Sequence, residues 1–185
     1  ARTFCDFRVQ SLPGARENAG RYGYGGARYA WESDTRGAEC CPSWQYGDHE
    51  VHVTADVVYG LAHYARAVND DYLRGPAAEV VVETARYWME RIDRRADGNP
   101  VLLGVMGPDE YTPISNNNAY TNWMVAFNLR LAAEIGESGG ASARERRLFR
   151  ETADALPIAR RGELVLQCDG FEDLAEPNFD VLWKD

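Results

Sequence analysis

Apolar side chains recur along this chain with the period of an α-helix, but the width of the apolar stripe changes from segment to segment. Residues 48–68 and 118–136 have apolar positions around much of the helix circumference, which is typical of a helix covered on all sides. Residues 76–95 and 142–156 confine their apolar positions to one stripe, with charged side chains opposite it. The pattern predicts a buried, an outer, a buried and an outer helix, in that order.

Residue types at the ends of these segments agree with the predicted boundaries. Pro76 stands at a helix start, Asn118 is a capping residue and Gly136 is a helix terminator. Ser142 and Glu145 have the spacing of a capping box. The charged face of the second helix carries two oppositely charged pairs at helical spacing, Glu83 with Arg86 and Glu90 with Arg94.

The rest of the chain predicts shorter elements and one long loop. Two short helices are expected at residues 4–10 and 15–22, separated by a break at Pro13 and Gly14. Residues 23–47 lack apolar periodicity yet hold five aromatic side chains, and a long aromatic loop in a compact domain is usually functional. The other expected elements are a strand at 99–106, a strand with a turn at 163–171 and an open end at 178–185.

Alternation of buried and outer helices is the arrangement that a barrel of paired helices requires. Inner helices touch neighbours on every side, whereas outer helices keep one solvated face. We therefore predict an all-α fold with short β segments. An irregular helical bundle would give a similar pattern and is the alternative.

The composition limits the classes of partner that the chain is expected to bind. A chain of 185 residues with 45% hydrophobic content can bury a sizeable core. Its formal net charge of −9 argues against a nucleic-acid partner, because such a surface needs basic side chains to neutralise phosphates. No apolar run is long enough for a membrane helix and no signal peptide is visible, so no membrane partner is expected.

The chain start and the cysteines add two expectations. The first residue is Ala1 rather than Met, which suggests that the chain is cut from a longer protein. The four cysteines lack the paired spacing of a metal site, and adjacent Cys40 and Cys41 rarely bond to each other without strain. Reduced thiols and a cytoplasmic location are expected.

Candidate chemistry is concentrated at residues 107–122. Glycine and proline at 107 and 108 predict a fixed turn, which would hold the carboxylates of Asp109 and Glu110 in a defined place. The amides of residues 116–118 could hold sugar hydroxyls, and the rings of Tyr111 and Tyr120 could pack on a pyranose. The alternative interpretation is a solvated turn followed by a helix cap.

Two further places have side chains suited to a sugar. Trp31 and Glu32 could pack the apolar face of a sugar and accept its hydroxyl hydrogens, although a loop tryptophan is commonly only packing. His52 is the best polar candidate among the histidines. His49 and His52 have a spacing that could suggest a metal, but no third ligand is evident, so no metal is predicted.

Three stretches together resemble glycoside hydrolase family 65, a family of inverting disaccharide phosphorylases, for maltose, trehalose and kojibiose, and of some hydrolases. They are Ala-Arg-Tyr-Ala-Trp-Glu-Ser at 27–33, Gly-Pro-Asp-Glu-Tyr at 107–111 and Asn-Asn-Ala-Tyr-Thr-Asn at 117–122. The resemblance implies an (α/α)6 barrel. Because twelve helices need on the order of 250 residues or more, residues 1–185 are expected to form about half of that catalytic domain.

The resemblance also implies roles for individual residues. Glu110 matches the general acid, which must carry its proton and is expected to lie buried beside the rings of Tyr111 and Trp31. Inorganic phosphate would attack as co-substrate, no other cofactor is implied, and the family's phosphate loop and Lys-Gln pair do not occur in this chain. The substrate-binding residues implied are Trp31, Glu32, His52, Asp109, Asn117, Asn118 and Tyr120.

Three functions are compatible with these residues. The leading one is part of an inverting phosphorylase that cleaves an α-glucosyl disaccharide into β-glucose 1-phosphate and a free sugar. The second is a hydrolase, in which another carboxylate at about 6.5–9.5 Å from the acid activates water. The third is a sugar-binding or interaction module without turnover.

Two geometric expectations follow. The side chains of Trp31, Glu32, Asp109, Glu110 and Asn117–118 should converge on one concave face. Because half a barrel exposes its inner helices, residues on them should also lie against an open edge, a partner chain or a rearranged packing. The residues expected at that edge are Val58, Leu61, Phe127 and Leu131.

Overall fold

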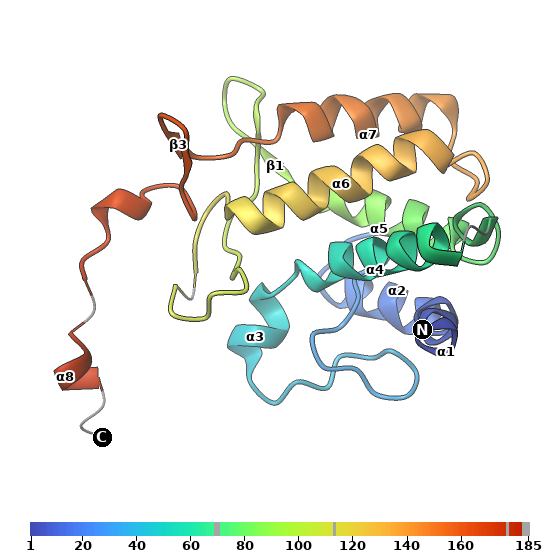
Figure 1. Ribbon diagram of the computed structural model, residues 1–185, viewed down its shortest axis with the longest axis horizontal. Helices are drawn as coiled ribbons and strands as arrows, with labels where there is room; N and C mark the ends of the chain where they lie inside the picture. Colours follow the sequence, from blue (N-terminus) through green and yellow to red (C-terminus); the bar gives the residue numbers. More distant parts are fainter. Residues whose placement is uncertain (69–70, 113, 177, 183–185) are drawn as a thin grey trace.

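The computed structural model describes residues 1–68, 71–112, 114–176 and 178–182. The described chain is all-α, as predicted, and forms part of an (α/α) barrel (Figure 1). Its α-helices are α1 (Arg2–Gln10), α2 (Leu12–Arg21), α3 (Trp44–His49), α4 (Val53–Val68), α5 (Ala78–Arg91), α6 (Ala119–Ile135), α7 (Ala143–Ala155) and α8 (Phe179–Leu182). Two single turns of 3-10 helix, η1 (Asp71–Leu73) and η2 (Phe171–Asp173), complete the helical elements.

Within the described residues, the named strands form two short antiparallel hairpins. β1 (Asp93–Arg94) pairs with β2 (Pro100–Val101), and β3 (Arg160–Arg161) pairs with β4 (Leu164–Val165). The strand predicted at 99–106 therefore shrinks to β2, followed by an isolated bridge between Val105 and Ser115. The predicted strand and turn at 163–171 correspond to β4 and the turn before η2.

Helix α6 is the centre of the packing, in contact with α4, α5 and α7. Figure 1 shows α7, α6 and α4 running side by side, with α5 behind them. Trp88 of α5 is fully buried, and its indole Nε1 donates to Asn128 Oδ1 of α6 at 3.1 Å. The Asn128 amide donates in turn to the Val81 carbonyl at 3.2 Å. These bonds satisfy the polar groups that α5 and α6 bury between them.

The predicted outer helices behave differently from each other. The capping box of Ser142 and Glu145 is formed at the start of α7, which buries Phe149, Thr152 and Ala153 and leaves its remaining face largely exposed. Helix α5 is buried far more completely than an outer helix should be, so that prediction is wrong. The N-terminal segment packs on it, as the hydrogen bond from Ala27 N–H to the Glu83 carbonyl at 3.0 Å shows.

Charge pairing on α5 is also only partly as predicted. Glu83 and Arg86 lie 2.7 Å apart, as expected. The second pair is not formed, because α5 ends at Arg91 and Arg94 lies in β1, where its guanidinium donates to the Gly98 carbonyl. Glu90 instead accepts from the Gly25 N–H at 2.6 Å.

Near the N-terminus, the predicted helix break is displaced. The chain breaks at Ser11 rather than at Pro13 and Gly14, and Pro13 lies in the first turn of α2, where a missing N–H removes no helical bond. Gly14 is required by close packing, since a Cβ there would approach the Arg36 carbonyl oxygen to 2.3 Å.

The helix predicted at 48–68 is divided. The chain forms α3 up to His49, leaves the helix over residues 50–52 and begins α4 at Val53. The long loop of residues 23–47 correspondingly ends in the first turns of α3. This interruption places Glu50 and His52 just before α4 rather than in the first turns of one continuous helix.

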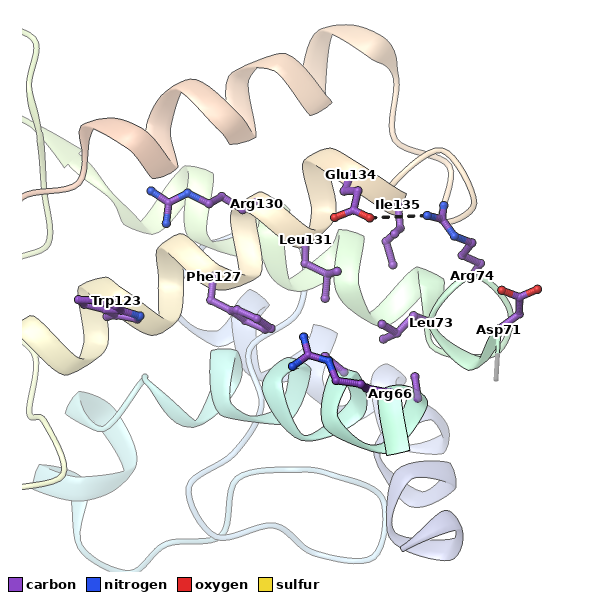
Figure 2. Close-up of a pocket in the computed structure, with 12 residues that line it drawn as sticks. Arg66, Asp71, Leu73, Arg74, Trp123, Phe127, Arg130, Leu131, Glu134 and Ile135 are labelled. Carbon is purple, nitrogen blue, oxygen red and sulfur yellow. Dashed lines mark ion pairs between the residues drawn. The ribbon is translucent and has the colours of Figure 1, made fainter. Parts of the chain in front are cut away.

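The face of α4 and α6 away from α5 is open. A groove of about 800 Å³ lies between these helices (Figure 2), and Trp123 on its rim is 60% exposed. Phe127 and Leu131 line it half-buried, as predicted for an open edge. Val58 and Leu61 are instead fully buried, because the core between α4 and α5 and the packing of α1 on α4 cover them.

The C-terminal tail leaves the helical body, as Figure 1 shows. Its hairpin exposes Leu164 and Val165, and α8 exposes Phe179 and Val181. The open end predicted at 178–185 thus contains α8, and its last residues, 183–185, lie outside the described part of the chain. Among the described residues, no helix has the length and apolar character needed to cross a bilayer.

Candidate active site

Glu110 lies in a loop that is fixed at its base. The Val105 and Ser115 backbones exchange hydrogen bonds of 2.9 and 2.8 Å, closing the loop of residues 105–115. His49 anchors this base to α3: its Nδ1 is 2.9 Å from the Gly104 carbonyl oxygen, and its own carbonyl accepts from Met106 N–H. The loop base is therefore held against the start of the α3–α4 interruption.

Asp109 shapes the loop tip. Its carboxylate accepts from the Gln167 side chain at 2.8 Å, from Tyr111 N–H at 3.1 Å and from the Thr112 hydroxyl at 3.3 Å. The Gln167 hydrogen bond, followed by that from the Tyr111 backbone, lowers the pKa of Asp109 despite some desolvation. Asp109 is thus a carboxylate engaged with its own chain, and the sugar contact predicted for it stays a prediction.

Asn117 and Asn118 lie beneath the loop, both buried. Asn117 has a φ of 50°, accepts from Leu102 N–H at 3.0 Å and donates to Asp169 at 2.7 Å. Asn118 caps α6 by accepting from Thr121 N–H, as predicted. Both amides support the scaffold, and their direct contact with sugar hydroxyls stays a prediction.

Gly107 is the loop residue that this packing demands. A Cβ at that position would lie 2.3 Å from Nδ2 of the Asn118 amide, which is itself fixed as the cap of α6. A close approach of backbone to side chain is a normal reason for glycine. The Gly-Pro-Asp-Glu turn and the asparagine run are therefore one packed unit.

Trp31 and Glu32 are held by a carboxylate that the sequence did not single out. Glu39 accepts from Trp31 N–H at 2.7 Å, from Glu32 N–H at 3.1 Å and from Cys41 N–H at 3.1 Å. The buried Asn18 accepts from the Glu39 backbone N–H at 3.0 Å. Trp31 is half-buried and Glu32 is exposed, so the loop presents both side chains from a fixed backbone.

His52 joins this loop to α6. Its ring makes edge contacts with Trp31 at a centroid distance of 5.9 Å and with Tyr120 at 5.3 Å. Its Nδ1 is 2.7 Å from Asp56 Oδ2, and the Tyr120 hydroxyl donates to Asp56 Oδ1 at 3.0 Å. His52, Trp31 and Tyr120 thus form one aromatic cluster built from three parts of the chain.

Glu50 connects this cluster to Glu110. Its side chain is 0% exposed, and its Oε2 is 3.3 Å from His52 Nε2. Burial, followed by the negative charge of Glu110, raises the pKa of Glu50 to about 7 against the lowering effect of His52. The structure therefore brings Glu110, Glu50, His52, Trp31 and Tyr120 into one neighbourhood.

Glu110 itself is exposed, which contradicts the expected burial between two rings. Tyr111 does not cover it: the Tyr111 ring is 73% exposed and faces Phe179 of the tail at 6.4 Å between centroids. The turn that Asp109 stabilises at the loop tip accounts for this separation of neighbouring side chains.

Sequence reasoning missed Glu39, Glu50 and Asp56. A usable signal existed for Asp56, because His52 and Asp56 are four residues apart and share a helix face. No comparable signal marked Glu50, since residues 48–68 read as one continuous helix. Over the described ranges, no group of three or more His, Cys, Asp or Glu side chains is arranged to hold a metal ion.

The helical architecture is that of part of an (α/α) barrel, and comparisons with known proteins give the family. The model of the "Glycosyl hydrolase family 65 central catalytic domain" matches residues 1–183. The chain belongs to this family.

Individual relatives include both phosphorylases and a glucosidase. The chain is 40% identical over 153 residues to kojibiose phosphorylase from Caldanaerobacter subterraneus subsp. tengcongensis, covering 73% of this chain and 19% of the relative. It is 34% identical to the mouse protein-glucosylgalactosylhydroxylysine glucosidase, covering 93% of this chain and 25% of that protein. The chain thus spans about a quarter or less of the length of these relatives.

A solved structure has the same arrangement of helices. It is described as "Putative kojibiose phosphorylase from human microbiome" and superposes with a TM-score of 0.82 at 26% identity. The match covers 91% of this chain and 24% of that one. This chain therefore corresponds in fold to about a quarter of that solved chain.

Proposed function

We propose that the complete protein, meaning this chain together with the remaining barrel helices that we predict, is an inverting disaccharide phosphorylase. Glu110 protonates the departing glycosidic oxygen while inorganic phosphate attacks the anomeric carbon from the opposite face. For an α-glucosyl disaccharide the products are β-glucose 1-phosphate and a free sugar. Residues 1–185 supply the acid and part of the sugar site.

The observation that carries this proposal is the placement of Glu110. It is an exposed carboxyl on a loop with a fixed base, in the same neighbourhood as an aromatic cluster of Trp31, His52 and Tyr120. Aromatic faces next to placed polar groups are a common form of sugar site. Membership of glycosyl hydrolase family 65 adds the class of reaction.

The side chains divide into two kinds of role in this proposal. Trp31 and Tyr120 pack on the sugar ring, while Glu32 and His52 contact its hydroxyls. Asp109, Asn117 and Asn118 hold the acid loop in place through the hydrogen bonds described above. Phosphate binds to parts of the complete protein that lie outside this chain.

Hydrolysis is the second candidate, favoured by the similarity to the mouse glucosidase. In that reaction, water replaces phosphate and a second carboxylate must activate it at about 6.5–9.5 Å from the acid. Glu50 does not suit this role, because it lies close enough to Glu110 for a side-chain hydrogen bond. A hydrolase would therefore need a base from another part of the complete protein.

The test is Glu110→Gln in the complete protein. Glutamine keeps the shape of the side chain but cannot release a proton, so cleavage should fall by roughly 10²- to 10⁴-fold while sugar binding is retained. Exposed Glu163 offers a matched control, and Glu163→Gln should leave the rate unchanged. Full activity of Glu110→Gln would refute both phosphorolysis and hydrolysis through this residue.

The products distinguish the two reactions. Release of β-glucose 1-phosphate at a rate that depends on phosphate supports phosphorolysis. Release of free glucose at the same rate without phosphate would refute it and establish hydrolysis, with Glu110 as the acid in either case.

A further inference from the structure

Asp56 is a carboxylate to which neither the fold nor the reaction above gives a role. It lies in the first turn of α4, where its side chain is 29% exposed. Its Oδ2 is 2.7 Å from Nδ1 of His52, and its Oδ1 accepts from the Tyr120 hydroxyl at 3.0 Å. The two oxygens of one carboxylate thus hold two different members of the aromatic cluster.

These two partners come from different elements. His52 precedes α4, whereas Tyr120 lies in the first turn of α6, 64 residues after Asp56. The rings of His52 and Tyr120 meet edge to face, with their planes at 88°. His52 is 4% exposed and Tyr120 is 43% exposed. Asp56 therefore joins a buried ring of the site to a ring that faces the solvent.

The geometry also indicates which nitrogen of His52 carries a hydrogen. An ionised carboxylate can only accept hydrogen bonds, so the ring nitrogen that lies 2.7 Å from Asp56 is the donor. The other ring nitrogen, Nε2, is 3.3 Å from Glu50 Oε2. Nδ1 therefore bears a hydrogen whether or not Nε2 does, and the bond to Asp56 sets the orientation of the ring.

We propose that Asp56 is a positioning residue of the sugar site, which holds His52 with a hydrogen on Nδ1 and fixes the Tyr120 hydroxyl. The cluster then has a single arrangement before the sugar binds. This inference rests on the proposed function, in which both rings meet the substrate, and it deepens that function by assigning their orientation to one carboxylate. A site that is already ordered loses less conformational freedom on binding, so the effect is on affinity for the sugar.

The hydrogen on Nδ1 can be observed without turnover. The ¹⁵N chemical shifts of a histidine ring separate a nitrogen that bears a hydrogen from one that does not. In this chain labelled with ¹⁵N-histidine, we expect Nδ1 of His52 to bear a hydrogen, with His52→Gln identifying the signal. A bare Nδ1 in the unmutated chain would overturn the inference, and this measurement needs no Asp56 variant to fold.

Asp56→Ala tests whether the carboxylate is the cause. Alanine suits a helix and removes the acceptor at Nδ1, which leaves Glu50 Oε2 as the carboxylate oxygen beside the ring. We therefore expect the hydrogen to move to Nε2 and the Nδ1 signal to take the position of a bare nitrogen. Asp154→Ala, at an exposed aspartate of α7, is the matched control and should leave the spectrum of His52 unchanged. A hydrogen that stays on Nδ1 in Asp56→Ala would overturn the proposal.

The same pair of variants tests the role in the complete protein. Because Asp56→Ala loosens two rings of the sugar site and leaves Glu110 untouched, KM for the disaccharide should rise roughly 5- to 30-fold while kcat changes much less. Asp154→Ala should leave both constants unchanged. A fall in kcat at constant KM, or an unchanged KM, would contradict a positioning role for Asp56.

The two proposals fail in different ways. A fully active Glu110→Gln protein refutes the proposed function and has no bearing on the hydrogen of His52. A bare Nδ1 in the unmutated chain, together with an inactive Glu110→Gln protein, refutes only the role of Asp56.

Discussion

Carboxylate side chains have different roles in this chain, depending on their surroundings. Asp109 accepts three hydrogen bonds and shapes a loop, Glu39 accepts three backbone N–H groups, and Glu50 is buried with few partners. Glu110 is exposed on its loop. The side-chain type is nearly constant, so the partners and the burial decide which carboxylate is structural and which is available for chemistry.

Glu39 gives a prediction at this scale. In Glu39→Gln, the amide NH₂ cannot accept from the backbone donors of Trp31, Glu32 and Cys41, so at least one of these bonds is lost. We expect the free energy of unfolding to fall by about 1–2 kcal/mol, measured by denaturant unfolding of this chain.

The same variant should alter substrate binding in the complete protein. Because Trp31 would lose its fixed backbone while Glu110 is untouched, KM for the disaccharide should rise more than kcat falls. Glu163→Gln serves as the comparison. A reduced kcat at unchanged KM would contradict a positioning role for Glu39.

At the scale of elements, the N-terminus of α7 links local sequence to tertiary packing. Ser142 and Glu145 form the capping box, and Arg86 of α5 lies 2.8 Å from Glu145. The Arg86 hydrogen bond, followed by those from Ser142, lowers the pKa of Glu145 to about 2. Glu145 thus stabilises the N-terminus of α7 and also links α7 to α5.

This lowered pKa predicts a pH-dependent contribution to stability. Glu145 ionises at a lower pH in the folded chain than in the unfolded chain, so its stabilising effect is complete above the unfolded pKa of 4.5 and is lost as the pH falls towards 2. We expect Glu145→Gln to destabilise the chain more at about pH 6.5 than at about pH 4 in denaturant unfolding.

A control exists on the same helix. Among the described residues, Glu151 pairs only with Arg147, at 3.6 Å on an exposed surface, so Glu151→Gln should have a small effect at both pH values. An equal loss of stability for Glu145→Gln at both pH values would show that the lowered pKa does not contribute.

At the scale of the whole molecule, the open surfaces are the main feature. The groove between α4 and α6 exposes Trp123, and the tail exposes Leu164 and Phe179 away from the helices (Figures 1 and 2). Exposed apolar surfaces of this kind are typical of interfaces. The chain covers about a quarter of the solved structure to which it is similar.

We therefore expect the isolated 185-residue chain not to turn over disaccharide, with or without phosphate. By our proposal it presents the acid and part of the sugar site, and the phosphate site lies elsewhere. An assay of glucose 1-phosphate and glucose release from the purified chain is the test. Phosphorolysis by the isolated chain would mean that arginines within it bind the phosphate.

Local sequence was enough to predict much of the fold. The periodicity of apolar positions predicted α4, α6 and α7, and the Asn118 cap and the Ser142 capping box are formed as expected. These features depend on contacts within about four residues, so they can be read from the chain itself. The turn at Gly107 and Pro108 is different, because Gly107 is required by its close contact with the Asn118 amide, which lies further along the chain.

Contacts between residues far apart in the sequence decided the features that the pattern of apolar positions could not predict. Helix α5 was predicted as an outer helix from its charged face, but the segment before residue 28 covers it. The interruption at residues 50–52 has no clear local signal, yet it places Glu50 and His52 beside a loop that begins more than fifty residues later. The sequence by itself determined where most of the longer helices form and which residue types could act on a sugar. Only the tertiary structure decided which carboxylates meet, because burial and charge neighbours arise between segments that the chain order keeps apart.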